Sequence, residues 1–303
     1  MFNSLADDFK NAFKRSDNSL MQFIIINVIV YVLLGIFLVV SKPLNIDYRT
    51  TFIVDIFFLP PTFSEFIYKP WTLFTYMFAH SIEDFFHILF NMLGLYWFGK
   101  LIMEYLGSKK FISLYILGGI TGGLFFMLIY TFAPDDLDFI NKSTLGLVGA
   151  SAAVYAVVVA AATLVPEYTF FLLFLGPVKI KYIAAVYVFL SFLGTVGANA
   201  GGNIAHLGGA FIGFLFIQLL RSGTDLGQPI HAVSDGVKAL FKPKPKIKVT
   251  YKKPGPRPGK PTSKNTIAQE EIDAILDKIA QSGYDKLSKE EKQKLFRASQ
   301  KEN

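Results

Sequence analysis

Residues 145–162, LGLVGASAAVYAVVVAAA, form an almost wholly apolar run in which Ser151 is the one side chain of nucleophile type. If the run is helical, Ser151 and Tyr155 lie four residues apart on one face. Beside them runs a stripe of small residues: Gly149, Ala153, Ala156 and Ala160. In lipid, small residues at this spacing mark a surface where another helix packs closely. The run therefore predicts a buried membrane helix that carries a serine at a helix interface.

A second stretch, residues 201–213 (GGNIAHLGGAFIG), places His206 in another apolar run, with Gly209 and Gly213 following on the same face. A serine and a histidine on two closely packed helices can come within hydrogen-bonding distance, which would give a nucleophile its base. A histidine inside a membrane helix can also be a hydrogen-bonded packing residue. Ionisable residues at membrane depth are costly, however, and this favours a functional role.

A third pair of polar residues, His87 and Asn91, lies four residues apart in the apolar stretch 85–106. Both side chains share one helix face, so they can point at one spot. Two donors aimed together suit an oxyanion hole. The spacing alone fits a polar contact between helices equally well.

These motifs, in this order on successive apolar stretches, resemble the rhomboid family of intramembrane serine proteases. The serine motif stands at Gly149-Ala150-Ser151-Ala152, the histidine motif runs from Ala205 to Gly213, and His-x-x-x-Asn stands at His87 and Asn91. The resemblance covers residues 15–221 and implies an all-α polytopic membrane protein with a six-helix bundle.

The resemblance also implies roles for individual residues. Ser151 would be the nucleophile and His206 its base, while His87, Asn91 and the Ser151 backbone N–H would stabilise the oxyanion. Tyr155 would pack on the histidine ring. Gly149 belongs to the serine motif. The later spans contain no Asp or Glu to orient His206, so the predicted pair is a dyad that needs no cofactor or metal.

The implied substrates are transmembrane segments of other membrane proteins. Two residues depart from the family pattern, because Ala152 stands where a Gly is usual and Thr72 where an Arg is usual. A catalytically silent relative that binds client membrane helices is the alternative. A transporter or channel would need paired charges or inverted repeats across the spans, and the sequence shows neither.

The composition supports a membrane protein, because 52% of the 303 residues are hydrophobic, 17% are charged and the mean hydropathy is +0.42. We expect six spans and, between the first two, an interfacial segment at 41–85 that contains Trp71 and His80. A hairpin or re-entrant turn is expected near 168–181. The spans are placed at about 21–40, 85–106, 111–132, 145–166, 181–198 and 204–220.

The charge is unevenly distributed, since residues 1–221 contain 13 basic and 13 acidic side chains and the remainder has 17 and 10. The basic residues near the spans cluster on the side of the termini, which predicts a protein of the cell membrane with both termini cytoplasmic. Residues 222–264 are predicted to be a basic linker near anionic lipid head groups rather than a nucleic-acid-binding segment.

The two ends of the chain are expected to form smaller segments. Residues 1–20 are a short amphipathic segment that fits either the lipid interface or a frayed terminus. Residues 265–303 are predicted to form two short helices, of which the second opens with the capping pair Ser288 and Glu291.

Overall fold

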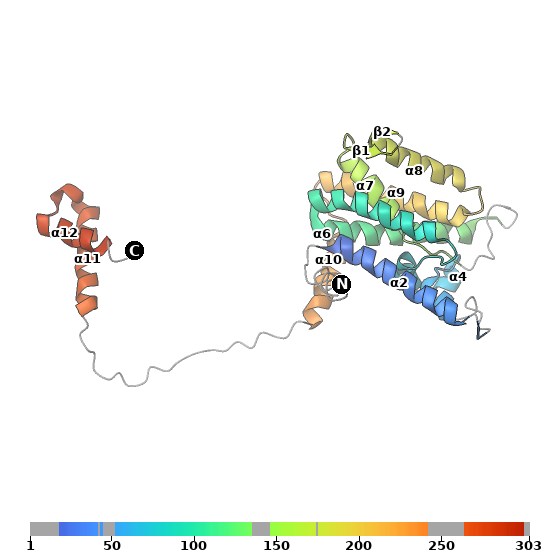
Figure 1. Ribbon diagram of the computed structural model, residues 1–303, viewed down its shortest axis with the longest axis horizontal. Coiled ribbons are helices and arrows are strands. Elements are labelled where there is room, and N and C mark those ends of the chain that lie inside the picture. The colour runs from blue at the N-terminus through green and yellow to red at the C-terminus, as the bar shows by residue number, and fades with distance from the viewer. Residues whose placement is uncertain are drawn as a thin grey trace. The chain divides into compact units, whose positions relative to one another are not determined.

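The computed structural model describes residues 18–41, 43–44, 52–134, 146–173, 175–241 and 264–299. The chain divides into two compact units, Met1–Lys242 and Pro243–Asn303 (Figure 1). The predicted amphipathic segment 1–20 lies almost wholly outside the described residues, as do most of the loop 133–144 and the linker residues 242–263.

The first unit is a bundle of apolar helices. They are α2 (Ser19–Ser41), α6 (Phe85–Phe132), α7 (Ser151–Leu164), α8 (Ile180–Gly194) and α9 (Ala200–Arg221). Of the described helices, α2, α6 and α9 are long and apolar enough to cross a membrane, and α7 and α8 are shorter apolar helices. α6 is broken at Gly107, where φ is 78°, so it consists of two helical segments, which correspond to the apolar stretches predicted at 85–106 and 111–132.

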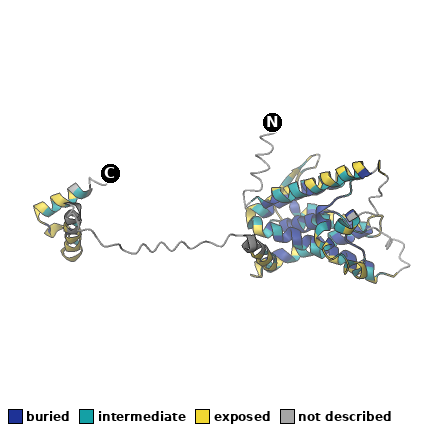
Figure 2. Ribbon diagram, turned by 90° about the horizontal axis from the view of Figure 1, so that it is seen from below, coloured by how far each residue is buried: buried dark blue, intermediate teal, exposed yellow. Residues whose placement is uncertain are grey.

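The centre of the bundle is formed by α6, α7 and α9, which meet through small residues. A β-carbon at Gly118 would lie 2.5 Å from the Cβ of Ala156, and one at Gly122 would lie 2.5 Å from the Cβ of Ala152. Helices approach this closely in membranes where side chains are absent or small. Figure 2 shows the buried residues concentrated in the middle of this unit.

α2 packs on the outside of this centre and is anchored by Asn27. The Asn27 amide is fully buried and donates to the hydroxyl of Tyr115 on α6 at 3.1 Å. Asn27 is therefore a polar contact between α2 and α6. The other buried residues of α2 are Ser19, Leu20 and Ser41, and the rest of the helix is partly or fully exposed, as Val39 at 71% illustrates.

The segment before α6, predicted to be interfacial, folds as short helices that are too short to cross a membrane. These are α3 (Phe52–Phe57), α4 (Phe63–Phe66), α5 (Thr72–Thr75) and the 3-10 turn η2 (Tyr76–Phe78). Its hydrogen bonds to α6 include Tyr115 Oη to the Met77 carbonyl at 2.7 Å. Thr72 is fully buried and donates to the Lys69 carbonyl at 2.6 Å, which satisfies its hydroxyl within the segment.

The fourth apolar run is helical over less of its length than predicted. α7 begins at Ser151, and residues 146–150 are not helical. Leu147 instead pairs with Leu59 in an isolated antiparallel bridge, with N–O distances of 2.8 and 3.0 Å. Gly146 and Gly149 have φ values of 125° and 134°, which only glycine adopts readily. Gly149 is therefore outside the helical stripe of small residues to which we assigned it.

A short antiparallel hairpin joins α7 to α8, as the sequence predicted. β1 (Thr169–Leu172) pairs with β2 (Gly176–Lys179), with Thr169 opposite Lys179. It is an exception to the predicted all-α class. α8 ends at Gly194, four residues before the predicted end of the fifth span, and its 15 residues reach about 22 Å.

The predicted linker 222–264 contains a further helix, α10 (Gln228–Phe241), which belongs to the first unit. An ion pair between Lys110 and Asp225 and a 3.4 Å contact between Ser113 Oγ and His231 Nε2 hold this region against α6. His231, which had no expected role, therefore takes part in packing.

The second unit contains α11 (Lys264–Ser282), the turn η3 (Tyr284–Lys286) and α12 (Lys289–Ser299). The predicted capping pair is confirmed, because Ser288 Oγ accepts from the Glu291 N–H at 3.2 Å and Glu291 accepts from the Ser288 N–H at 2.7 Å. α11 begins at Lys264, one residue before the segment 265–303 that was predicted to form two helices.

Candidate active site

The structure brings Ser151 and His206 into direct contact, with 2.7 Å between Ser151 Oγ and His206 Nε2. The glycines of α9 make this approach possible. A β-carbon at Gly209 would overlap the carbonyl oxygen of Ala152, and one at Gly213 would overlap that of Ala156. His206 precedes Gly209 by three residues and lies on the same face of α9. The close packing of Gly209 against Ala152 therefore brings the His206 ring next to Ser151.

The other ring nitrogen of His206 meets a residue that the sequence did not single out. Ser191 on α8 is 2% exposed, and its Oγ lies 3.1 Å from His206 Nδ1. The same hydroxyl donates to the hydroxyl of Tyr155 at 2.8 Å. Since Ser191 donates its hydrogen to Tyr155, its oxygen is left to accept one from Nδ1.

Tyr155 packs flat on the histidine, with ring centroids 4.2 Å apart and an angle of 10° between the planes. Its hydroxyl also donates to the carbonyl of Tyr187 on α8 at 3.4 Å. The imidazole of His206 is thus held by a ring on one face and by hydrogen bonds at both nitrogens.

His87 lies on the other side of the serine, beside Gly149. A β-carbon at Gly149 would be 3.0 Å from His87 Cε1 and 3.1 Å from Nε2, so a larger residue would displace the ring. Asp84 is the N-cap of α6, and its carboxylate accepts a hydrogen bond from the backbone N–H of His87 at 3.1 Å. His87 and Ser151 both line a polar cavity of about 290 Å³ between α6, the 146–149 segment and the start of α9.

Asn91 is 6% exposed and lies one turn along α6 from His87. Its amide donates to the His87 carbonyl at 2.9 Å, within its own helix. The cavity lining includes His87 but not Asn91. The side-chain amide of Asn91 has two N–H donors, and the bond to the His87 carbonyl uses one of them, so the second can still donate to another acceptor. The structure therefore places His87 in the cavity that Ser151 also lines, and Asn91 outside that lining, one turn further along α6.

His80 supports the segment that leads into α7. Its Nε2 accepts from the backbone N–H of Ala150 at 3.4 Å, and its ring meets His87 edge to face with centroids 5.2 Å apart. Burial, with a smaller contribution from His87, lowers the pKa of His80 to about 3. The neutral ring can therefore accept the hydrogen bond at neutral pH.

The methyl group of Ala152, the departure from the usual glycine, points away from the cavity. Ala152 is 1% exposed, and its Cβ faces Gly122 on α6. Ala152 is also absent from the cavity lining. The added methyl group therefore fills space between helices and does not obstruct the approach to Ser151.

Sequence reasoning missed Ser191 and the contact between His80 and Ala150. Ser191 did leave a signal, because it is the only serine or threonine in the apolar helix 180–194. A lone hydroxyl in such a helix indicates a polar contact with a neighbouring helix. His80 left none, because it lies in an irregular segment where no periodicity indicates its direction.

Comparison with known proteins identifies two matched regions. A family model described as the rhomboid domain matches residues 68–223, and a model described as a family of unknown function, DUF6576, matches residues 262–301. The first match contains all six predicted site residues.

Individual relatives match the same part of the chain. It is 31% identical over 160 residues to RHOMBOID-like protein 12, mitochondrial, of Arabidopsis thaliana, and 33% identical over 147 residues to Rhomboid protein 1, mitochondrial, of Saccharomyces cerevisiae. These matches cover 50% and 46% of this chain, but only 47% and 39% of the two relatives. The putative rhomboid protease YdcA of Bacillus subtilis is 28% identical over 156 residues, covering 49% of this chain and 68% of that protein.

Proposed function

Because this chain belongs to the rhomboid family, we propose that it is an intramembrane serine endopeptidase that cleaves transmembrane segments of other membrane proteins. The observation that carries the proposal is the 2.7 Å contact between Ser151 Oγ and His206 Nε2 beside a polar cavity. A serine hydroxyl becomes an effective nucleophile only when a neighbouring base takes its proton.

The hydrogen bonds around His206 are consistent with such a base. For Nε2 to accept the proton of Ser151, the hydrogen of the neutral ring must lie on Nδ1. Ser191 Oγ is positioned to accept that hydrogen at 3.1 Å. The stacked ring of Tyr155 limits rotation of the imidazole. Ser191 thus has the orienting role that a carboxylate has in a triad, although it supplies no charge.

The oxyanion of the tetrahedral intermediate would form at the start of α7. The Ser151 N–H is at the N-terminus of that helix, where the helix dipole favours negative charge. His87 can donate from the cavity side, with Asn91 one turn behind it. Removing one such donor typically costs about 3 kcal/mol of transition-state stabilisation. As Ser151 attacks the scissile carbonyl, its proton passes to His206, which gives it to the departing amine as the peptide C–N bond breaks and the acyl-enzyme forms. Water then hydrolyses the acyl-enzyme, with His206 taking the proton of the water and returning it to Ser151 Oγ.

We further propose that the bundle crosses the membrane six times. The crossings are α2, the two segments of α6, α7, α8 and α9. On this topology Lys110, Lys181 and Arg221 lie on the side of both termini, which the distribution of basic residues makes cytoplasmic in a cell-membrane protein. Two of the relatives are named as mitochondrial proteins.

The decisive experiment is labelling of the detergent-solubilised full chain with a fluorophosphonate probe. We expect wild type to be labelled and Ser151→Ala and His206→Ala to be unlabelled. Ser81→Ala is the matched control, because Ser81 lines the same cavity but is not within the dyad, and it should label normally. If wild type fails to react where an active rhomboid protease does, the chain is instead a binder of client membrane helices.

A further inference from the structure

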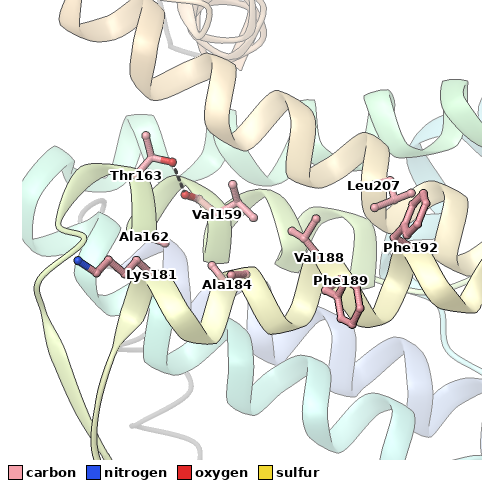
Figure 3. A pocket seen from close by; sticks show the side chains of 10 residues that line it. Val159, Ala162, Thr163, Lys181, Ala184, Val188, Phe189, Phe192 and Leu207 are labelled. Atoms are coloured by element: carbon pink, nitrogen blue, oxygen red, sulfur yellow. Dashed lines mark hydrogen bonds between the residues drawn. The ribbon is translucent and has the colours of Figure 1, made fainter.

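A second hollow, which shares no lining residue with the polar cavity, lies between α8 on one side and α7 and α9 on the other. It is an open groove of about 610 Å³ lined mainly by apolar side chains. Figure 3 shows Val159 of α7, Ala184 and Val188 of α8 and Leu207 of α9 facing it, with Phe189 and Phe192 at one end and Lys181 at the other. It is therefore apolar along its length and cationic at one end.

The length of the groove corresponds to one leaflet of a bilayer. Phe192 follows Lys181 by eleven residues on α8, which is about 16 Å along a helix axis. This is roughly half of the ~30 Å hydrocarbon core. Lys181 is in the first turn of α8 and Phe192 is in its last turn, so the groove runs from a membrane surface along most of this short helix. A single extended acyl chain fits that length, whereas a typical transmembrane helix of about 30 Å would extend beyond it.

The surface end of the groove carries excess positive charge. Lys179 and Lys181 share the single carboxylate of Glu167, with Lys179 Nζ 2.6 Å from it. The two lysines lower the pKa of Glu167 to about 2, so this carboxylate is ionised at neutral pH. Both of its oxygens are already paired with lysines. Arg221 donates to the carbonyl of Thr163, a residue that lines the groove, at 2.7 Å.

Within the described residues, Arg221 pairs with no carboxylate, so three cations at this end face one anion. The lysine and glutamate side chains are also accessible, with exposed fractions of 48% for Lys179 and 38% for Lys181. A phosphate group at the level of the lipid head groups would meet two net positive charges there.

We propose that this groove binds an anionic phospholipid, with one acyl chain along α8 and the phosphate at Lys181, Lys179 and Arg221. A zwitterionic lipid would fill the same apolar length but gain less from the cationic end. A positive charge near an anionic lipid head group changes affinity by roughly fivefold. The proposal rests on the membrane embedding of the helices and is independent of protease activity.

The test uses tryptophan fluorescence in vesicles whose lipids have brominated acyl chains, which quench at contact. Trp71 and Trp97 are the only tryptophans in the sequence and are replaced by Phe, after which Phe189→Trp reports on the groove. Phe214→Trp is the matched control, because Phe214 is exposed at a similar depth on α9 but does not line the groove. The full chain is reconstituted in phosphatidylcholine vesicles containing phosphatidylglycerol, with one or the other brominated.

We expect the tryptophan at 189 to be quenched several-fold more effectively by brominated phosphatidylglycerol than by brominated phosphatidylcholine. The tryptophan at 214 should show no preference. Lys181→Gln should reduce the preference by roughly fivefold, whereas Lys69→Gln, which removes a lysine paired with Asp55, should leave it unchanged.

If Lys181→Gln fails to fold, a salt titration of the parent protein decides the question, because salt screens an exposed cationic site and should weaken the preference. Equal quenching by the two lipids at position 189, or a preference unaffected by both Lys181→Gln and salt, would overturn the proposal. Absence of quenching at 189 would show that the groove is closed to lipid.

Discussion

α9 and α8 both pack against α7, but they do so through opposite kinds of surface. Gly209 and Gly213 of α9 bring backbone against backbone, leaving no room for a methyl group. α8 presents larger side chains such as Phe189 and Phe192, which are 58% and 61% exposed, and a groove remains beside it. Ser151 and His206, the proposed nucleophile and base, meet across the close contact, whereas Ser191, proposed to orient the base, lies on the loose one. The close contact therefore brings the two proposed catalytic side chains together, and the loose contact supplies the partner of His206 Nδ1.

The largest expected effect comes from disrupting the close contact with Gly209→Ala. The new methyl group would overlap the Ala152 carbonyl, which is backbone and cannot rotate away, so we expect a loss of about 3 kcal/mol in the free energy of unfolding. Unfolding in mixed micelles measures it. Gly35→Ala on α2 is the control, because nothing lies within 4 Å of its β-carbon, and it should change stability by less than about 1 kcal/mol. Equal effects at the two positions would contradict the packing described here.

The loose contact is tested by Ser191→Ala. Loss of the hydrogen bond to His206 Nδ1 should slow fluorophosphonate labelling by about tenfold and, because Ser191 is buried, should cost about 1 kcal/mol of stability. Ser191→Thr retains the hydroxyl and should recover most of the rate. Thr195→Ala removes a hydroxyl that bonds only within the end of α8 and is expected to have no effect. A labelling rate that is unchanged in Ser191→Ala would remove α8 from the mechanism.

A smaller effect is expected for Ala152→Gly, which restores the residue usual in the family. Because the Ala152 methyl packs against Gly122 and not into the cavity, labelling should change by less than about twofold. The added backbone freedom should cost about 1 kcal/mol of stability. A large gain in labelling would show that the methyl group obstructs the site after all.

The smallest effect concerns His80, which supports the entry to α7. Its pKa is about 3 in the folded protein, whereas the ordinary value is 6.5, so the unfolded chain takes up the proton first as pH falls. Between pH 7.5 and pH 6 this should cost about 0.8 kcal/mol of stability, and the loss continues towards pH 3. His80→Gln should lack this contribution. The measurement is the difference in pH dependence between wild type and variant, and parallel curves would contradict the assignment.

The sequence predicted the parts of the site that depend on spacing along one helix. One face of α7 carries Ser151 and Tyr155, and one face of α9 carries His206, Gly209 and Gly213. The observed contacts join those two faces. Periodicity was less informative where the backbone departs from a helix. The apolar composition of residues 146–150 resembles the rest of the run, but the bridge to Leu59 and the positive φ of Gly146 and Gly149 keep this segment out of the helix.

By itself, then, the sequence determined which segments are apolar, which helix faces are small enough to pack, and which polar side chains lie on those faces. The tertiary structure decided what each polar atom meets: Ser191 at the second nitrogen of His206, the methyl of Ala152 against Gly122, and His80 beneath Ala150. The physical reason is that the helical repeat specifies the direction of a side chain about its own axis, whereas the rotation and depth of one helix against another arise from packing among many residues at once.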